Sequence, residues 1–120
     1  METTLSPQEI RENLAQFHGT ENFYKHPLCN VIWTDGAQYV IDSCNAHWLV
    51  SDVCIQCDAL KDKSEFIKVQ LSCDNEKGTL EYTNGNGKLL HVHEYRYTDF
   101  PLDVIAFYYT NRTLLLPSEY

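Results

Sequence analysis

The spacing of apolar residues changes from helical to strand-like along this chain. In the first half, apolar side chains recur every three or four residues, which places them on one face of an α-helix. Three such stripes predict three helices, because each stripe would give a helix one apolar face to bury. The stripes are Ile10, Leu14 and Phe17; Ala37, Val40, Ile41 and Cys44; and Leu49, Val53, Cys57 and Leu60.

The first helix has a recognisable start. Ser6 precedes Pro7 and lies three positions before Glu9, which is the pattern of a capping box. Proline suits the first turn because the N–H that it lacks has no partner there. Gly19 favours a stop after the stripe, so the pattern predicts a helix over 7–17.

A short strand and two further helices are expected next. The β-branched and aromatic run at 30–33 favours a strand, and Thr34 or Asp35 can cap the helix that follows. That helix is expected to end at Asn45, and the third helical pattern covers 47–60.

After these helices the apolar residues alternate with polar ones, which is the pattern of a half-buried strand. The inner row of this strand would be Ile67, Val69, Leu71 and Cys73. Turn-forming segments at 74–78 and 84–87 separate it from two more strands, the last of which ends near Tyr97. The three strands are predicted to form an antiparallel meander.

The end of the chain is predicted to contain one more helix. Segment 98–103 combines acidic residues with a proline, which suits the first turn of a helix. The tail at 113–117 is expected to be extended or docked. The apolar stripe of this last helix would be Leu102, Ile105, Ala106 and Tyr109.

Three consecutive aromatic residues lie within that predicted helix: Phe107, Tyr108 and Tyr109. One helix cannot bury all three against one face of a core. Either the sheet and the tail cover them, or at least one of Phe107 and Tyr108 is exposed or contacts another chain. Tyr108 is therefore a candidate partner-binding residue, since tyrosine is a favoured interface anchor.

Together these elements predict an α+β fold in a single domain over 1–120. The sheet would be an antiparallel meander of roughly three to five strands, with about four helices packed mainly on one face. Apolar residues make up 43% of the chain, which is enough for a core that needs no disulfides.

Most of the net negative charge lies in the first half of the chain. The formal net charge is −8, and no Lys or Arg occurs between Lys25 and Lys61. Such a field repels phosphate backbones and anionic lipids and complements basic protein surfaces. The expected partner is therefore a protein with a basic surface, not a nucleic acid or a membrane. The sequence leaves open whether the protein also forms a homodimer. The candidate partner-binding acids are Asp35, Asp42, Asp52 and Asp58.

The compartment expected from the sequence is the cytoplasm. The N-terminus has no positively charged leader, and no apolar run approaches the roughly 18 residues of a membrane span. The chain has five cysteines, and an odd number cannot all pair in disulfides within one chain, so reduced thiols are expected.

Two short patterns leave a metal-binding or redox protein as the alternative function. Cys54 and Cys57 form a CxxC, and His91 and His93 share one face of a strand. No second paired motif completes a zinc site, so buried core cysteines and a polar strand edge are favoured, with no metal or cofactor expected. The remaining histidines, His18, His26 and His47, are expected at the surface or at helix ends.

Four segments resemble a family of small proteins from bacteria, cyanobacteria and mobile elements. They are LAQFHGTE at 14–21, TDG at 34–36, TDFPLD at 98–103 and LLLPSEY at 114–120. That family is a domain of unknown function, so the resemblance implies no catalytic residue. By analogy, small acidic proteins of mobile elements often inhibit host defence or nucleic-acid enzymes.

The function that these observations predict is a small, acidic, non-enzymatic interaction module. Its acidic helical face would dock on a basic surface of a partner, and long-range charge would steer the encounter. If the partner is a nucleic-acid-binding or defence complex of the CRISPR type, the protein would act as an inhibitor that competes with phosphate for Lys and Arg sites. The alternative is that the acidic residues only make the protein soluble.

Overall fold

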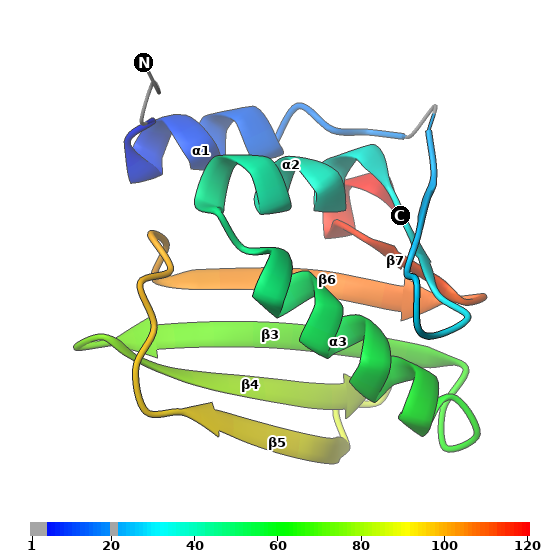
Figure 1. The fold of residues 1–120 in the computed structure, drawn as a ribbon. Helices are drawn as coiled ribbons and strands as arrows, with labels where there is room; N and C mark the ends of the chain where they lie inside the picture. The colour runs from blue at the N-terminus through cyan, green and yellow to red at the C-terminus, as the bar shows by residue number, and fades with distance from the viewer. Residues whose placement is uncertain (1–4, 20–21) are drawn as a thin grey trace.

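Three α-helices and a seven-stranded β-sheet make up the computed structural model, which describes residues 5–19 and 22–120. The helices are α1 (Pro7–Leu14), α2 (Asp35–Cys44) and α3 (His47–Leu60). The strands are β1 (Tyr24–Lys25), β2 (Ile32–Trp33), β3 (Phe66–Asp74), β4 (Lys77–Asn84), β5 (Leu89–Tyr95), β6 (Val104–Thr110) and β7 (Thr113–Leu115), followed by a 3₁₀ turn, η1 (Pro117–Glu119). Figure 1 shows α3 crossing in front of β3 and β4, with α1 and α2 beyond the β6 side of the sheet. The predicted α+β fold in one compact domain is confirmed.

The order of the strands is β1-β2-β7-β6-β3-β4-β5. β3, β4 and β5 are antiparallel neighbours, which confirms the predicted meander. The prediction of three to five antiparallel strands is wrong, because the sheet has seven strands and β2 pairs with β7 in parallel. β1, β2 and β7 contain only two or three residues each, which is too short for an alternating pattern to show in the sequence.

The helix that the sequence predicts after segment 98–103 is a strand in the structure, β6. Ile105, Phe107 and Tyr109 are buried at alternate positions and pair with the inner row of β3. The same stretch also fits helical spacing, but β-branched and aromatic residues favour a strand once β3 offers a pairing partner. The described chain therefore has three α-helices where about four are predicted.

Alternation along β6 separates Phe107 from Tyr108. Phe107 is 0% exposed and lies opposite Val69 of β3 on the helical side of the sheet. Tyr108 lies on the other side, where its ring contacts those of Phe66 and Tyr120 at centroid distances of 4.9 and 5.4 Å. Of the two aromatic residues, Tyr108 is thus the one outside the main core.

The helix starts agree with the sequence prediction. Ser6 Oγ accepts a hydrogen bond from the Glu9 amide at 3.2 Å, and Glu9 Oε1 accepts one from the Ser6 amide at 3.1 Å. Thr34 caps α2 by accepting from an amide of its first turn at 3.3 Å. α3 spans the predicted residues, whereas α1 ends at Leu14, before Phe17.

The C-terminal tail docks on the first turn of α2. Glu119 Oε1 accepts hydrogen bonds from Thr34 Oγ1 at 2.7 Å and from the Leu116 amide at 2.9 Å. Glu119 Oε2 accepts one from the Gly36 amide at 3.2 Å. A carboxylate is favoured there because the first amides of a helix have no partner within it. Of the predicted tail at 113–117, residues 113–115 are extended as β7, and the Glu119 contact docks the residues that follow.

The core lies between the helices and the inner rows of β3, β4 and β6. Its fully buried members include Leu49 and Val53 of α3 and Val69 of β3. Within the described ranges, none of the helices combines the length and apolar character that a membrane crossing requires.

Candidate functional site

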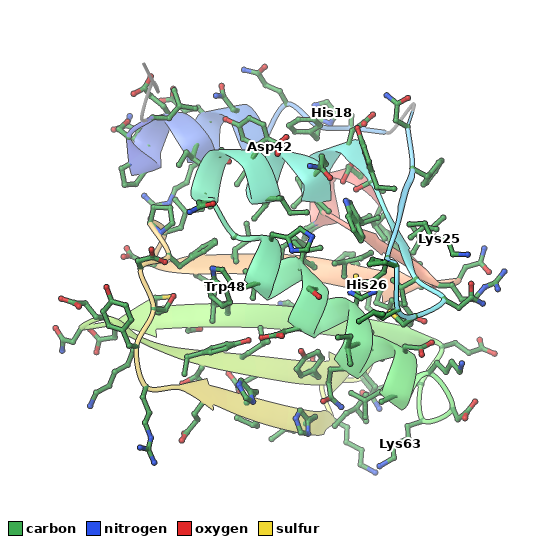
Figure 2. The ribbon with its side chains drawn as sticks, in the orientation of Figure 1. His18, Lys25, His26, Asp42, Trp48 and Lys63 are labelled. Carbon is green, nitrogen blue, oxygen red and sulfur yellow. The ribbon has the colours of Figure 1, made fainter. Side chains whose placement is uncertain are left out.

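The two candidate acids of α2 have different roles. Asp35 is half-buried and accepts hydrogen bonds from the Asn22 amide and the Tyr24 hydroxyl, both at 3.2 Å. Burial and then the bond to Asp35 raise the pKa of Tyr24, and the nearby Asp42 charge adds to this. Asp42 is exposed on α2 and accepts a hydrogen bond from Gln38 Nε2 at 3.1 Å (Figure 2). Asp35 thus anchors the chain before α2, and Asp42 is free to face a partner.

The two candidate acids of α3 lie on different sides of that helix. Asp52 is exposed, and its Oδ2 accepts a hydrogen bond from the Tyr95 hydroxyl of β5 at 2.8 Å. Asp58 is half-buried, and its Oδ1 lies 3.3 Å from Lys61 Nζ. The four predicted acids therefore do not form one continuous face.

Asp52 lines a groove, which runs between α3 and the β4–β5 side of the sheet. Its volume is about 200 Å³. Ile55, on its α3 wall, is 47% exposed and offers apolar surface. The other lining residues are Gln56 of α3, Leu80 and Tyr82 of β4, and His93 and Tyr95 of β5.

The groove has the chemistry of a binding site for a cation. The Tyr95 ring lies edge-on to His93 at 4.5 Å and to Trp48 at 5.2 Å between centroids. Burial and the bond to Asp52 raise the pKa of Tyr95, so this phenol stays protonated and donates. Asp52 Oδ1 makes no hydrogen bond within the part of the chain that the structure describes. A carboxylate beside aromatic rings suits the head group of Lys or Arg.

His91 and His93 lie on the helical side of β5, opposite Tyr82 and Leu80 respectively. The His91 ring is tilted against that of Tyr82 at 5.6 Å. Over residues 5–19 and 22–120, no three His, Cys, Asp or Glu side chains gather closely enough to hold a metal ion. The histidine pair and the CxxC therefore do not combine into a site.

Cys54 and Cys57 lie in the core face of α3, both 0% exposed. Burial raises the pKa of the Cys54 thiol to about 12 and also raises that of Cys57, with a further contribution from neighbouring thiols. A redox-active CxxC requires the opposite, an exposed thiol with a lowered pKa. The pair packs as core residues.

Cys54 and Cys57 are expected to resist thiol labelling in the native protein. Neither side chain is accessible, and the raised pKa keeps Cys54 as the unreactive thiol at mildly alkaline pH. Mass spectrometry after timed exposure to a disulfide reagent should show Cys29 and Cys73, which are partly exposed, modified first. Rapid labelling of Cys54 without urea would contradict this assignment.

His26 is buried, although the sequence suggests a surface or helix-end position. It is 2% exposed, and its Nε2 lies 2.8 Å from Ser51 Oγ of α3 (Figure 2). Its Nδ1 accepts a hydrogen bond from the Leu28 amide at 3.0 Å, which places the proton on Nε2. His26 therefore donates to Ser51 and cannot act as a base toward it. The hydrogen bond fastens the loop between β1 and β2 to α3. The position of His26 in the sequence does not indicate that it contacts Ser51.

Tyr108, the fifth candidate, lies away from the groove. It is half-buried on the sheet face opposite α3, in the aromatic cluster with Phe66 and Tyr120. The structure does not bring it together with the acids of α2 and α3.

Comparison with known proteins is informative at the level of the family. A search finds no matching curated protein and no matching solved structure. The model of the family of unknown function DUF6876 matches residues 8–120, nearly the whole chain, which confirms the resemblance noted in the sequence. The chain therefore belongs to the family of unknown function DUF6876.

Proposed function

We propose that this protein is a non-enzymatic interaction module that docks on a basic protein surface and takes a Lys or Arg side chain of its partner into the α3–β5 groove. The observation that carries this proposal is the Asp52 carboxylate, which lines the groove, accepts a hydrogen bond from Tyr95 at 2.8 Å through Oδ2, and has no hydrogen bond to Oδ1 among the described residues. The net charge of −8 would steer a basic partner toward the protein.

The groove suits arginine better than lysine, whose ammonium acts as a point charge. A guanidinium can donate to Asp52 Oδ1 while its plane stacks on an aromatic or imidazole ring. Its aliphatic stem can pack on Ile55, which is exposed at the groove. Asp42 and Asp58, which lie outside the groove, would act through long-range attraction and affect the association rate more than the dissociation rate.

A protein that normally binds nucleic acid is the class of partner that this chemistry favours. Such proteins present clustered Lys and Arg that pair with phosphates. An acidic protein that occupies those side chains would act as an inhibitor, and a CRISPR-type defence complex attacked by a mobile element is one example of such a partner.

A titration with short peptides tests the groove. We expect acetyl-Gly-Arg-Gly-amide to shift the backbone NMR signals of Asp52, Gln56, His93 and Tyr95, with a dissociation constant on the order of millimolar. The same peptide with citrulline, a neutral isostere of arginine, should bind far more weakly. Asp52→Asn keeps an acceptor for Tyr95 but removes the charge, and it should lower the affinity about tenfold.

The control for that titration is Asp62→Asn, which removes one exposed acid outside the groove and so reduces the net negative charge by the same amount. It should leave peptide binding almost unchanged. Equal shifts with arginine and citrulline peptides, or equal losses in the two variants, would rule out the groove as a cation site.

A further inference from the structure

β5 is an open edge of the sheet. It is the last strand in the order, and Figure 1 shows it at the lower margin of the sheet, with no described element beyond it. Among the described residues, β4 is the one element whose backbone hydrogen-bonds to β5. Because alternate residues of an edge strand direct their N–H and C=O groups away from the sheet, β5 presents a row of backbone donors and acceptors for another strand.

The usual protection of an edge strand is largely missing from β5. Natural proteins protect such strands with prolines, lysines, bulges or very short length. β1, at the opposite edge, has two residues, whereas β5 has seven and contains neither Pro nor Lys. Its register with β4 shifts once, where Tyr82 pairs with His91 and Thr83 pairs with Leu89, so the irregularity lies at the start of β5. The stretch from His91 to Tyr95 is therefore a regular edge that another strand can join.

The two faces of this edge differ in chemistry. His93 and Tyr95 lie on the helical side and line the α3–β5 groove together with Asp52. Val92 lies on the outer face, which is the face of the sheet away from α3, and is 38% exposed. Successive side chains of an added strand would lie on alternate faces. A residue beside His93 or Tyr95 would thus lie on the side of the groove, and its neighbour in sequence would lie beside Val92.

A basic side chain suits the helical side of such a strand. Tyr95 reaches Asp52 from β5, with 2.8 Å between its hydroxyl and Asp52 Oδ2. Arginine is about as long as tyrosine, so an arginine beside Tyr95 on an added strand can extend over the edge toward the same carboxylate. A charge-assisted hydrogen bond would then add to the backbone pairing.

Charge also selects the occupant of the edge. A second copy of the protein would bring another net charge of −8, and the two copies would repel each other. The net charge and Asp52 instead favour a segment that carries a cation. Glu94 shares a hollow beside the edge with Lys77 and Arg96, so the outer face adds no preference for a second cation. An apolar residue suits Val92 better.

We infer that β5 takes an extended segment of a partner protein as an eighth strand, with an Arg or Lys of that segment on the helical side and an apolar residue next to it against Val92. This inference rests on the function proposed above and deepens it, because it gives the basic surface of the partner a backbone conformation. Backbone hydrogen bonds along the edge would supply affinity, and the groove would supply the preference for a cation.

Peptide length tests the edge separately from the groove. Acetyl-Thr-Val-Arg-Val-Thr-amide can pair along β5, whereas acetyl-Gly-Arg-Gly-amide is too short and too flexible to do so. We expect the longer peptide to bind about tenfold more tightly in an NMR titration and to slow the exchange of alternate β5 amides with solvent. Equal affinity of the two peptides with unchanged amide exchange would overturn the added strand and leave the proposed function standing.

A scan of backbone N-methylation along the longer peptide gives a signature of strand pairing. Each methyl group removes one N–H donor, and only alternate residues of an added strand direct that donor at the edge. The affinity should fall about tenfold at alternate positions and change little at the positions between them. A uniform loss at every position, or no loss at any position, would contradict the inference.

Val92→Lys tests the same edge from the side of the protein. The variant replaces apolar surface with a positive charge, so it should weaken the longer peptide about tenfold and leave acetyl-Gly-Arg-Gly-amide almost unaffected. Gln70→Lys is the matched control, because Gln70 lies in the same row of the outer face, two strands away, with Glu81 between them. Equal losses in the two variants would reduce the effect to long-range charge and overturn docking at the edge.

Two further outcomes separate this inference from the proposed function and from self-association. A citrulline version of the longer peptide that binds as tightly as the arginine peptide, and protects the same amides, would overturn the proposed function while keeping the added strand. If neither peptide binds, and light scattering shows a dimer in which the β5 amides are protected, the occupant is a second copy and the inference is overturned.

Discussion

Replacing Phe107 by alanine is expected to lower the free energy of unfolding by about 3–5 kcal/mol, because it leaves a cavity in the centre of the core. Phe107 is 0% exposed and lies on β6 opposite Val69, beneath the helices. Urea denaturation followed by circular dichroism measures the change, provided that the m-value stays constant. If the variant does not fold, Phe107→Leu should still show a smaller loss of the same sign.

Tyr108→Ala is the matched control, since the neighbouring residue points to the other side of the same strand. It should cost about 1 kcal/mol, because the half-buried ring is lost from a surface cluster and leaves no internal cavity. If this segment were a helix, as the spacing of apolar residues allows, the two substitutions would lower the free energy of unfolding by similar amounts. Comparable large losses from both would therefore contradict the strand assignment of β6.

The elements that could be predicted from sequence are those with a long and unambiguous period. The stripes of α2 and α3 and the alternation in β3 each extend over enough residues to exclude the other period. β6 is ambiguous because Ile105 and Tyr109 lie four positions apart and fit both periods. Its state depends on pairing with β3, whose partner residues lie 32 to 44 positions earlier in the chain, and a local pattern does not contain that information.

The candidate site shows the same division between local and long-range signals. The gap in basic residues directed attention to Asp52, but the residue that it bonds, Tyr95, lies 43 residues away. The burial of His26 against Ser51 depends on which segments meet in space. Residue types suggested the available chemistry, whereas the grooves that assemble it follow from the tertiary fold.

Removing the Glu119 carboxylate is expected to destabilise the protein by about 3 kcal/mol, although this residue lies in the last turn of the chain. Three donors, the Thr34 hydroxyl and the amides of Gly36 and Leu116, would lose their acceptor in Glu119→Ala. Hydrogen bonds to a charged group are each worth about 1.5–3 kcal/mol, and water can replace part of them here. Chemical denaturation of the variant measures the loss.

Gly36→Ala should cost a similar amount by a different route. A Cβ at this position would collide with the Glu119 carboxylate and lie only 2.6 Å from Leu116 Cδ1, so the side chain of Glu119 must withdraw. Its φ is not in the left-handed region, and alanine is otherwise the better helix former, so the cost comes from the displaced carboxylate. Gly19→Ala is the control, because nothing lies within 4 Å of the Cβ that it adds.

The double variant separates this mechanism from a general effect on α2. If Gly36→Ala acts by displacing Glu119, then Gly36→Ala in the Glu119→Ala background should cost much less than it does alone, leaving only the contact with Leu116. Additive losses would instead mean that the two residues act independently and that the tail does not cap α2. A coupling energy of more than about 1 kcal/mol would establish the docked tail as part of the folded core.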